Sequence, residues 1–151
     1  MTSFKVLETN HPRLDAIEKV TGTATYASDV YLPGMLMCKL LLSTQSHAKI
    51  VSIDVAEAKN IPGVRAVITG QDYPEVHFGS GGLRDRYIMP RDEVFYVGEP
   101  IAAVAADNEI IAQTALDAIK VLYEPLPNVV NSLAALDPGS PIVHPDLPSF
   151  E

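Results

Sequence analysis

Two strand–helix–strand patterns constrain the fold of this chain more than any other feature of its sequence. Residues 49–70 begin with a β-branched strand, continue into a short helix that Pro62-Gly63 ends, and return as a strand over residues 64–69. Residues 100–123 follow the same order, and their helix has apolar residues at i, i+3, i+4 and i+7 spacing. The two units differ in length and sequence, so we do not take them for an internal repeat. Together they predict a domain that contains both helices and strands.

Local signals predict where these helices begin. Asp54 followed by Glu57 has capping-box spacing before the first helix. Asp107 is expected to cap the second helix, with Glu109 in its first turn, where a carboxylate complements the helix dipole. A further buried strand is expected over residues 35–43, because this run is apolar apart from one lysine.

Three segments without clear periodicity surround the two units. Residues 1–24 are a polar lead segment, and residues 21–26 predict a turn that leads into a short strand. Residues 71–93 hold glycines, prolines and charges, and predict a long surface loop of the kind that is often functional. We therefore expect one domain over residues 25–127, followed by an irregular, proline-rich linker over residues 128–151.

Charge and composition exclude several classes of function. The chain has 151 residues, a size typical of one domain, and a formal net charge of −8. The densest basic stretch, Arg84, Arg86 and Arg91, is interrupted by Asp85 and Asp92. Binding to nucleic acid or to an anionic membrane needs a basic face, so both are disfavoured.

Cysteine content and hydropathy predict the compartment. Cys38 is the only cysteine, so neither an intrachain disulfide nor a cysteine-based metal or iron–sulfur site can form within the chain. It lies in an apolar run and is expected to be an inert core residue. No secretory signal is visible at the N-terminus, and no apolar run is long enough to span a bilayer. We expect a soluble, cytoplasmic protein.

Glu99 is the first candidate for chemistry, because it lies between a glycine and a proline in the stretch YVGEPIAAVAAD. A catalytic carboxylate needs a partner and a pocket, and the local sequence offers neither. We expect Gly98 to permit a tight turn, Pro100 to begin a strand, and Glu99 to face water.

The glycine-rich GSGG stretch, residues 79–82, is the second candidate. It matches neither a phosphate-binding loop nor a dinucleotide fingerprint, because no strand ends before it and no helix begins after it. Capture of an anion by its backbone, with Arg84 or Arg86, remains an alternative.

The remaining candidate side chains lack the spacing that metal binding or nucleophilic catalysis requires. The histidines have no paired spacing and are expected in surface or turn positions rather than as ligands. They are His11, His47, His77 and His144. The serines have no G-x-S-x-G context. The serines considered as candidate nucleophiles are Ser28, Ser43 and Ser46.

The order of several short motifs nevertheless resembles one known module. The stretch from residue 22 to residue 127 is similar to the start of the large subunit of molybdenum hydroxylases, the xanthine dehydrogenase and aldehyde oxidase family. The similar motifs, in order, are Gly22, Ala24, Tyr26 and Asp29; Pro33, Gly34 and Leu36; SHAKI at 46–50; GVRAVITGQD at 63–72; and VGEPIAAVAAD at 97–107. No single motif is diagnostic, but the ordered set is specific.

The resemblance implies a fold and a role. The fold is α+β, an α/β hammerhead with a mixed sheet, two strand–helix–strand units and a long irregular loop. The role is that of a structural domain in the molybdenum-binding subunit of an enzyme that hydroxylates a purine, a related heterocycle or an aldehyde, with water as the oxygen source. The chain alone is expected to be inactive, with no catalytic, cofactor-binding or metal-binding residues of its own.

Cofactors and partners follow from the same resemblance. Molybdopterin, [2Fe-2S] clusters and FAD are expected in downstream domains or in other subunits, and these are the expected partners. A domain of this kind should expose apolar surface, and Tyr31, Met35, Met37 and the proline-rich tail are the candidates. The substrate stays open among xanthine, aldehydes, nicotinate, carbon monoxide and an aromatic CoA thioester, as do the electron acceptor and the pterin form.

Two other functions remain as alternatives. The chain could be a stand-alone, non-catalytic binding or assembly module that reuses the fold. It could also be a small enzyme whose site lies in the loop 71–93, which requires a pocket lined by carboxylates near Asp85, Asp92 or Glu93.

Overall fold

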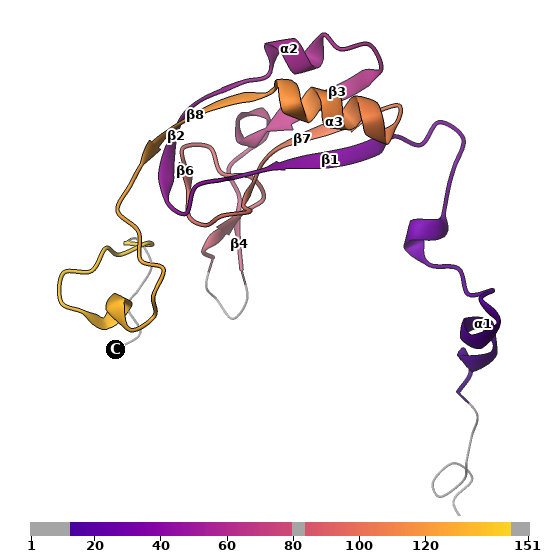
Figure 1. Cartoon of the computed structure of the whole chain (residues 1–151), viewed down its shortest axis with the longest axis horizontal. Helices are drawn as coiled ribbons and strands as arrows, with labels where there is room; N and C mark the ends of the chain where they lie inside the picture. The colour runs from indigo at the N-terminus through magenta and orange to yellow at the C-terminus, as the bar shows by residue number, and fades with distance from the viewer. Residues whose placement is uncertain (1–12, 80–83, 146–151) are drawn as a thin grey trace, which may run out of the picture. The chain divides into compact units, whose positions relative to one another are not determined.

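The structure is a computed structural model that describes residues 13–79 and 84–145. The chain divides into two compact units, Met1–Met35 and Leu36–Glu151. Figure 1 shows that the strands and the longest helix belong to the second unit. The domain bounds expected at residues 24/25 and 127/128 stay a prediction.

The first unit contains a helix that the sequence did not predict. Helix α1, Ala16–Thr21, ends at Gly22, whose φ of 70° lies in the left-handed region that glycine adopts readily. None of its residues is buried, so it lacks the apolar periodicity by which a helix is recognised in a sequence. The short strand expected after the turn at residues 21–26 is wrong, because a 3₁₀ turn, η1, Ala27–Asp29, occupies that position.

Sheet A is one of two three-stranded sheets in the second unit. It consists of β1 (Met37–Leu42), β7 (Pro100–Ala106) and β3 (Val64–Thr69), with β7 in the centre. Both pairs in this sheet are antiparallel. The predicted strand after residue 35 and both predicted strands at 64–69 and 101–106 are confirmed.

Sheet B consists of β6 (Glu93–Val94), β2 (Ala48–Asp54) and β8 (Lys120–Pro125), with β2 in the centre. Its pairs are antiparallel too. The α+β hammerhead class is confirmed, but the mixed sheet is wrong for the described strands. Each strand–helix–strand unit begins in one sheet and ends in the other, so its two strands never pair in parallel.

The core lies between α3 and the inner surfaces of the two sheets. Helix α3, Glu109–Ala118, covers sheet A (Figure 1), and the shorter α2, Ala56–Lys59, packs beside it. Two buried clusters share Leu41, Ile53 and Val121, so the apolar interior is continuous from one sheet to the other. Burial of these side chains is the main favourable contribution to folding.

The helix starts differ slightly from the prediction. Asn108, in extended conformation, caps α3, and its side-chain oxygen accepts the N–H of Ile111 at 2.9 Å. Asp107 instead binds Arg65, with 2.6 Å between Oδ1 and Nε. At α2, Asp54 accepts the N–H of Ala56 at 3.0 Å, but Glu57 pairs with Lys120 rather than completing a capping box.

The described residues of the loop 71–93 form more regular structure than the sequence predicts. It begins within a 3₁₀ turn, η2, Gly70–Asp72, and contains a small hairpin of β4 (His77–Phe78) and β5 (Arg86–Tyr87). Strands of two residues are too short to produce a recognisable alternation of apolar and polar side chains. Gly70 fixes the start of this segment, because a Cβ there would lie 2.4 Å from the carbonyl oxygen of Pro90.

Candidate functional site

The turn that joins β6 to β7 is built around Glu99. Gly98 has a φ of 91°, and Pro100 is the first residue of β7, so both predictions for this turn are confirmed. The expectation that Glu99 faces water is wrong, because only 2% of this residue is exposed. Its carboxyl group turns back into the turn and accepts the N–H of Phe95 at 2.7 Å.

The hydrogen-bond partners of Glu99 are backbone groups. A sequence pattern can indicate a partner side chain but not a backbone partner, so these contacts were not predicted. Burial raises the pKa of Glu99, and the N–H groups of Phe95 and Tyr96 oppose that rise. Ser43 completes the arrangement, since its N–H donates to the Glu99 carbonyl and its carbonyl accepts the Gly98 N–H, each at 2.8 Å. Glu99 thus supports the connection between the two sheets.

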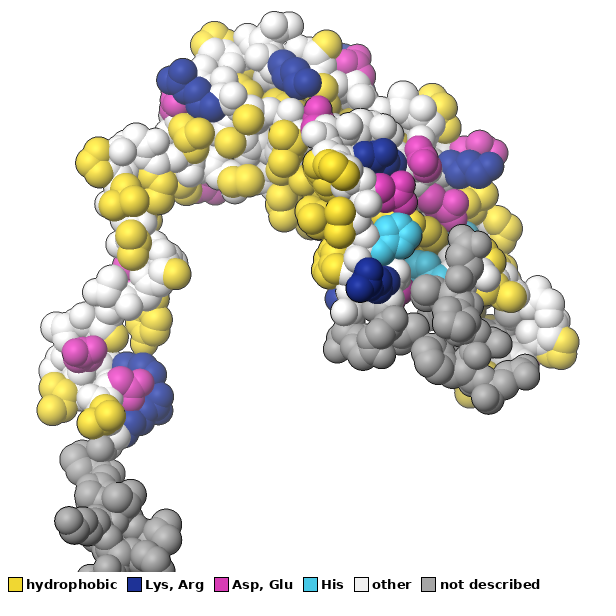
Figure 2. All heavy atoms as spheres, turned by 180° about the vertical axis from the view of Figure 1, so that it is seen from behind, with side chains coloured by type: hydrophobic (Ala, Val, Ile, Leu, Met, Phe, Trp, Pro, Cys, Tyr) yellow, Lys and Arg dark blue, Asp and Glu magenta, His cyan; other side chains and the backbone are white. Residues whose placement is uncertain are grey.

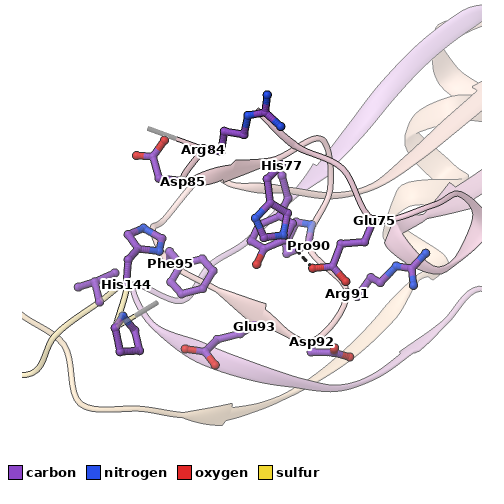
Figure 3. Close-up of a pocket in the computed structure, with 13 residues that line it drawn as sticks. Glu75, His77, Arg84, Asp85, Pro90, Arg91, Asp92, Glu93, Phe95 and His144 are labelled. Atoms are coloured by element: carbon purple, nitrogen blue, oxygen red, sulfur yellow. Dashed lines mark hydrogen bonds and ion pairs between the residues drawn. The ribbon is translucent and has the colours of Figure 1, made fainter. Parts of the chain in front are cut away.

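A shallow hollow of about 270 Å³ lies beside this turn, between the β4–β5 hairpin and the segment near His144. Its walls combine aromatic rings with charged groups (Figure 3). The described lining residues are Glu75, His77, Arg84, Asp85, Tyr87, Pro90, Arg91, Asp92, Glu93, Phe95, Val143, His144 and Pro145. Figure 2 shows histidine side chains beside acidic ones on the surface of this unit.

The structure brings the three predicted acids of the loop, Asp85, Asp92 and Glu93, around this one hollow. Several of the polar side chains there already hold structural contacts. Glu75 Oε1 lies 3.0 Å from His77 Nε2, and the guanidinium of Arg91 donates to the carbonyls of Gly70 and Tyr73. The described lining residues include no serine, threonine, cysteine or lysine, so the small-enzyme alternative cannot draw a nucleophile of these four types from them.

Aromatic rings connect this hollow to sheet B. The centroid of the Phe95 ring is 4.6 Å from that of His144 and 6.2 Å from that of Tyr87. His77 contacts Tyr87 edge-on at 4.4 Å. His47 stacks on Phe95 at 5.9 Å. The sequence did not indicate this cluster, because its members come from four separate segments.

The histidines and serines occupy different environments. His77 is partly exposed, in agreement with the prediction, but the side chain of His47 is only 10% exposed and contacts Glu93. Ser43 is buried, and its Oγ lies 3.0 Å from the backbone N and O of Gln45. Ser46 Oγ accepts a hydrogen bond from the Asn128 amide. His11 and residues 80–83 of the glycine-rich loop lie outside the described residues.

Cys38 is exposed, so its prediction as a core residue is wrong. It belongs to what we call the apolar face, the surface of sheet A opposite α3. This face consists of Cys38, Leu40, Leu42, Ala66, Ile68, Ala103 and Ala105. It holds no charged residue, and 49% of Leu40, 48% of Leu42 and 41% of Ile68 are exposed.

Sheet B turns a different surface outward, which we call the charged face. It consists of Lys49, Ser52, Asp54, Lys120, Leu122 and Glu124, and four of these six residues are charged. Opposite charges lie directly across the strands, in the pairs Lys49–Glu124 and Asp54–Lys120. Such pairs are typical of a surface that faces water.

Comparisons with known proteins identify the fold. A sequence model of the family described as "Aldehyde oxidase and xanthine dehydrogenase, a/b hammerhead domain" matches residues 21–127. The chain belongs to this family. The chain is also 38% identical over 143 residues to the nicotinate dehydrogenase large molybdopterin subunit of Eubacterium barkeri, covering 95% of the chain and 34% of that protein.

Two further relatives extend this finding. The chain is 40% identical over 134 residues to a subunit of a probable xanthine dehydrogenase of Bacillus subtilis, covering 89% of the chain and 18% of that relative. The solved structure of an aldehyde oxidoreductase from Desulfovibrio gigas is similar to this chain, with 35% sequence identity and a TM-score of 0.77. The similar region covers 91% of this chain and 16% of the oxidoreductase chain. The hammerhead domain thus spans about a third or less of these relatives.

The described residues of the hammerhead domain form neither a metal-ion site nor an iron–sulfur site. Within residues 13–79 and 84–145, no group of three or more His, Cys, Asp or Glu side chains is placed to hold a metal ion. The one cysteine of the sequence is too few for an iron–sulfur cluster with four thiolate ligands. Among the helices that the structure describes, none is long and apolar enough to cross a membrane.

Proposed function

We propose that this hammerhead domain is a structural part of the molybdenum-binding subunit of a xanthine dehydrogenase-like enzyme. The enzyme would hydroxylate a purine or a related heterocycle or aldehyde, with water as the oxygen source. The observation that carries the proposal is the 40% identity, over 89% of the chain, to part of a probable xanthine dehydrogenase. The match to a nicotinate dehydrogenase keeps another nitrogen heterocycle as a candidate substrate.

In this proposal the domain supplies no catalytic, cofactor-binding or metal-binding residue. Molybdopterin, iron–sulfur clusters and FAD would be bound by other domains or subunits, which would be its partners. The apolar face supports the proposal, because a row of half-exposed Leu40, Leu42 and Ile68 without any charge suits a surface that packs against another part of a larger protein. The cytoplasm would be the compartment.

The experiment is to purify, from its own organism, the assembly that contains this chain. Molybdenum is measured by mass spectrometry, and the initial rate of hydroxylation is compared for xanthine, nicotinate and an aromatic aldehyde. About one molybdenum per copy of the chain, with xanthine as the preferred substrate, is the predicted result.

Other outcomes separate the parts of the proposal. Molybdenum together with a preference for nicotinate or the aldehyde would refute only the purine substrate. A purified assembly without molybdenum would refute the enzymatic role and favour a stand-alone binding or assembly module.

A further inference from the structure

His47 lies where the chain enters β2, and it contacts the segment by which the chain leaves β8. Its Nε2 is 2.6 Å from Glu93 Oε1, and its Nδ1 is 2.5 Å from the carbonyl oxygen of Pro127. A carbonyl oxygen and an ionised carboxylate only accept hydrogen bonds. A neutral imidazole has one N–H and can therefore satisfy only one of these two contacts.

Two arrangements of protons satisfy both contacts. Either His47 carries a proton on each ring nitrogen and Glu93 is ionised, or His47 is neutral and Glu93 carries the second proton. The surroundings favour the first arrangement. The Glu93 side chain is 33% exposed, and Lys49 lies directly across the strand pair from it, so water and a positive charge both stabilise the carboxylate.

We propose that His47 is an imidazolium that holds residues 126–128 against sheet B. We call this contact the clasp, and it depends on the second ring proton of His47. The side chain is 10% exposed and is covered by the stacked ring of Phe95. A charge-assisted hydrogen bond in such a partly buried site is stronger than one between neutral groups. When His47 loses one ring proton it loses one hydrogen-bond donor. Either the Glu93 carboxylate or the Pro127 carbonyl is then left without its hydrogen bond from the ring.

Two further hydrogen bonds hold the same segment, and neither involves a titratable group. The N–H of Leu126 donates to the carbonyl of His47 at 3.0 Å, and the amide of Asn128 donates to Ser46 Oγ at 2.6 Å. The clasp is therefore expected to loosen rather than to open fully when His47 is neutral. Other titratable or charged groups on the elements packed around His47 include Lys49, Tyr87, Glu93, Tyr96, Tyr123, Glu124 and His144.

The position of the clasp gives it a consequence for the rest of the chain. The family match ends at residue 127, the residue whose carbonyl His47 binds. His47 therefore fixes the direction in which the chain leaves the hammerhead domain. It is a positioning residue, and the inference does not depend on the proposed substrate.

The test uses nitrogen-15 NMR on the full 151-residue chain at neutral pH. We expect a directly bonded hydrogen on both ring nitrogens of His47; an unprotonated nitrogen at either position would overturn the proposal. Hydrogen exchange of the Leu126 amide, corrected for the intrinsic rate, reports the clasp. Its protection should fall roughly tenfold or more from the pH at which both ring nitrogens carry a hydrogen to alkaline pH.

A matched pair of variants separates the clasp from general stability. In Glu93→Gln the side-chain amide can donate a hydrogen bond to a neutral His47, so both contacts form without a second ring proton. We therefore expect His47 in this variant to carry one ring proton, and the protection of the Leu126 amide to be independent of pH. His77→Gln changes a more exposed histidine that also contacts a carboxylate, and it should leave both readouts as in the wild type. Unaltered pH dependence in Glu93→Gln would refute the proposal.

Discussion

The two sheets of the hammerhead domain are similar in size but differ in the surface they turn away from the core. The apolar face of sheet A has seven residues without a charge, and its large side chains are nearly half exposed. The charged face of sheet B alternates lysines and acids in cross-strand pairs. Both sheets are antiparallel and have three strands, so the difference lies in the side chains and not in the backbone.

This difference indicates which side of the domain meets water. Charged side chains stay hydrated on an open surface, whereas exposed apolar side chains gain free energy only when they are covered. We therefore expect the apolar face to be covered by other parts of the proposed enzyme and the charged face to remain open.

The largest predicted effect comes from placing a charge on each face. Leu40→Arg puts an unpaired charge on the apolar face, and Leu122→Arg puts one on the charged face, at positions 49% and 58% exposed. In the proposed assembly, burying the new charge at residue 40 is costly, so the yield and melting temperature of the assembly should fall strongly. Leu122→Arg should leave both nearly unchanged. Equal effects of the two variants would remove the distinction between the faces.

The second prediction concerns the connection from sheet A towards sheet B. In Gly70→Ala the new Cβ would lie 2.4 Å from the Pro90 oxygen and 2.8 Å from the Met89 oxygen, which are both backbone atoms. The strain should lower the free energy of unfolding by about 1–3 kcal/mol, measured in urea. The control, Gly98→Ala, meets no atom within 4 Å and strains only its own backbone, where φ is 91°. Gly70→Ala should be the more damaging of the two.

The third prediction concerns Glu99, in the other connection between the sheets. Because burial raises its pKa, the folded protein holds this proton more tightly than the unfolded chain does. This contribution to stability is present at acid pH and is lost as the pH rises above the ordinary value for glutamate. Glu99→Gln removes the titration and keeps an oxygen that accepts the Phe95 N–H. Relative to the wild type, the variant should gain stability as the pH rises above about 4, measured by urea unfolding.

A pH-independent difference between Glu99→Gln and the wild type would contradict the burial of an ionisable carboxyl group. Asp72 provides an internal comparison of opposite sign. The backbone N–H of Thr69 lowers its pKa, so Asp72→Asn should lose stability relative to the wild type as the pH rises.

The smallest effect is expected on the charged face itself. Lys49→Glu would place three acids side by side, because residue 49 lies between Glu93 and Glu124 in register. The surface is exposed and screened, so the loss of stability should be roughly 1 kcal/mol or less and should shrink at high salt. A larger, salt-independent loss would mean that this face is packed rather than open.

Much of the fold could be predicted because its elements are long and regular. The strands around residues 64–69 and 101–106 and the helix before residue 119 have clear periodicity. Helix α1 buries nothing, and the β4–β5 hairpin has two-residue strands, so neither produces a pattern. The resemblance to molybdenum hydroxylases depended on the order of short motifs, and the family match confirmed it.

The local environments could be predicted less well. Glu99 was expected in water because its partners are N–H groups of the backbone, which every residue except proline carries. Cys38 was expected in the core because the run around it is apolar on both faces, although α3 covers only one. The contact between His47 and Glu93 joins residues far apart in sequence and leaves no local signal.

The most direct test of the account is the accessibility of Cys38, the only cysteine of the chain and a member of the apolar face. The isolated chain and the assembled enzyme are alkylated without denaturant, and mass spectrometry measures modification of the Cys38 peptide. Ser52→Cys places a second thiol on the charged face as a control. We predict that Cys38 reacts in the isolated chain and is protected in the assembly, while the thiol introduced at position 52 reacts in both. Equal reactivity of Cys38 in the two forms would contradict the account.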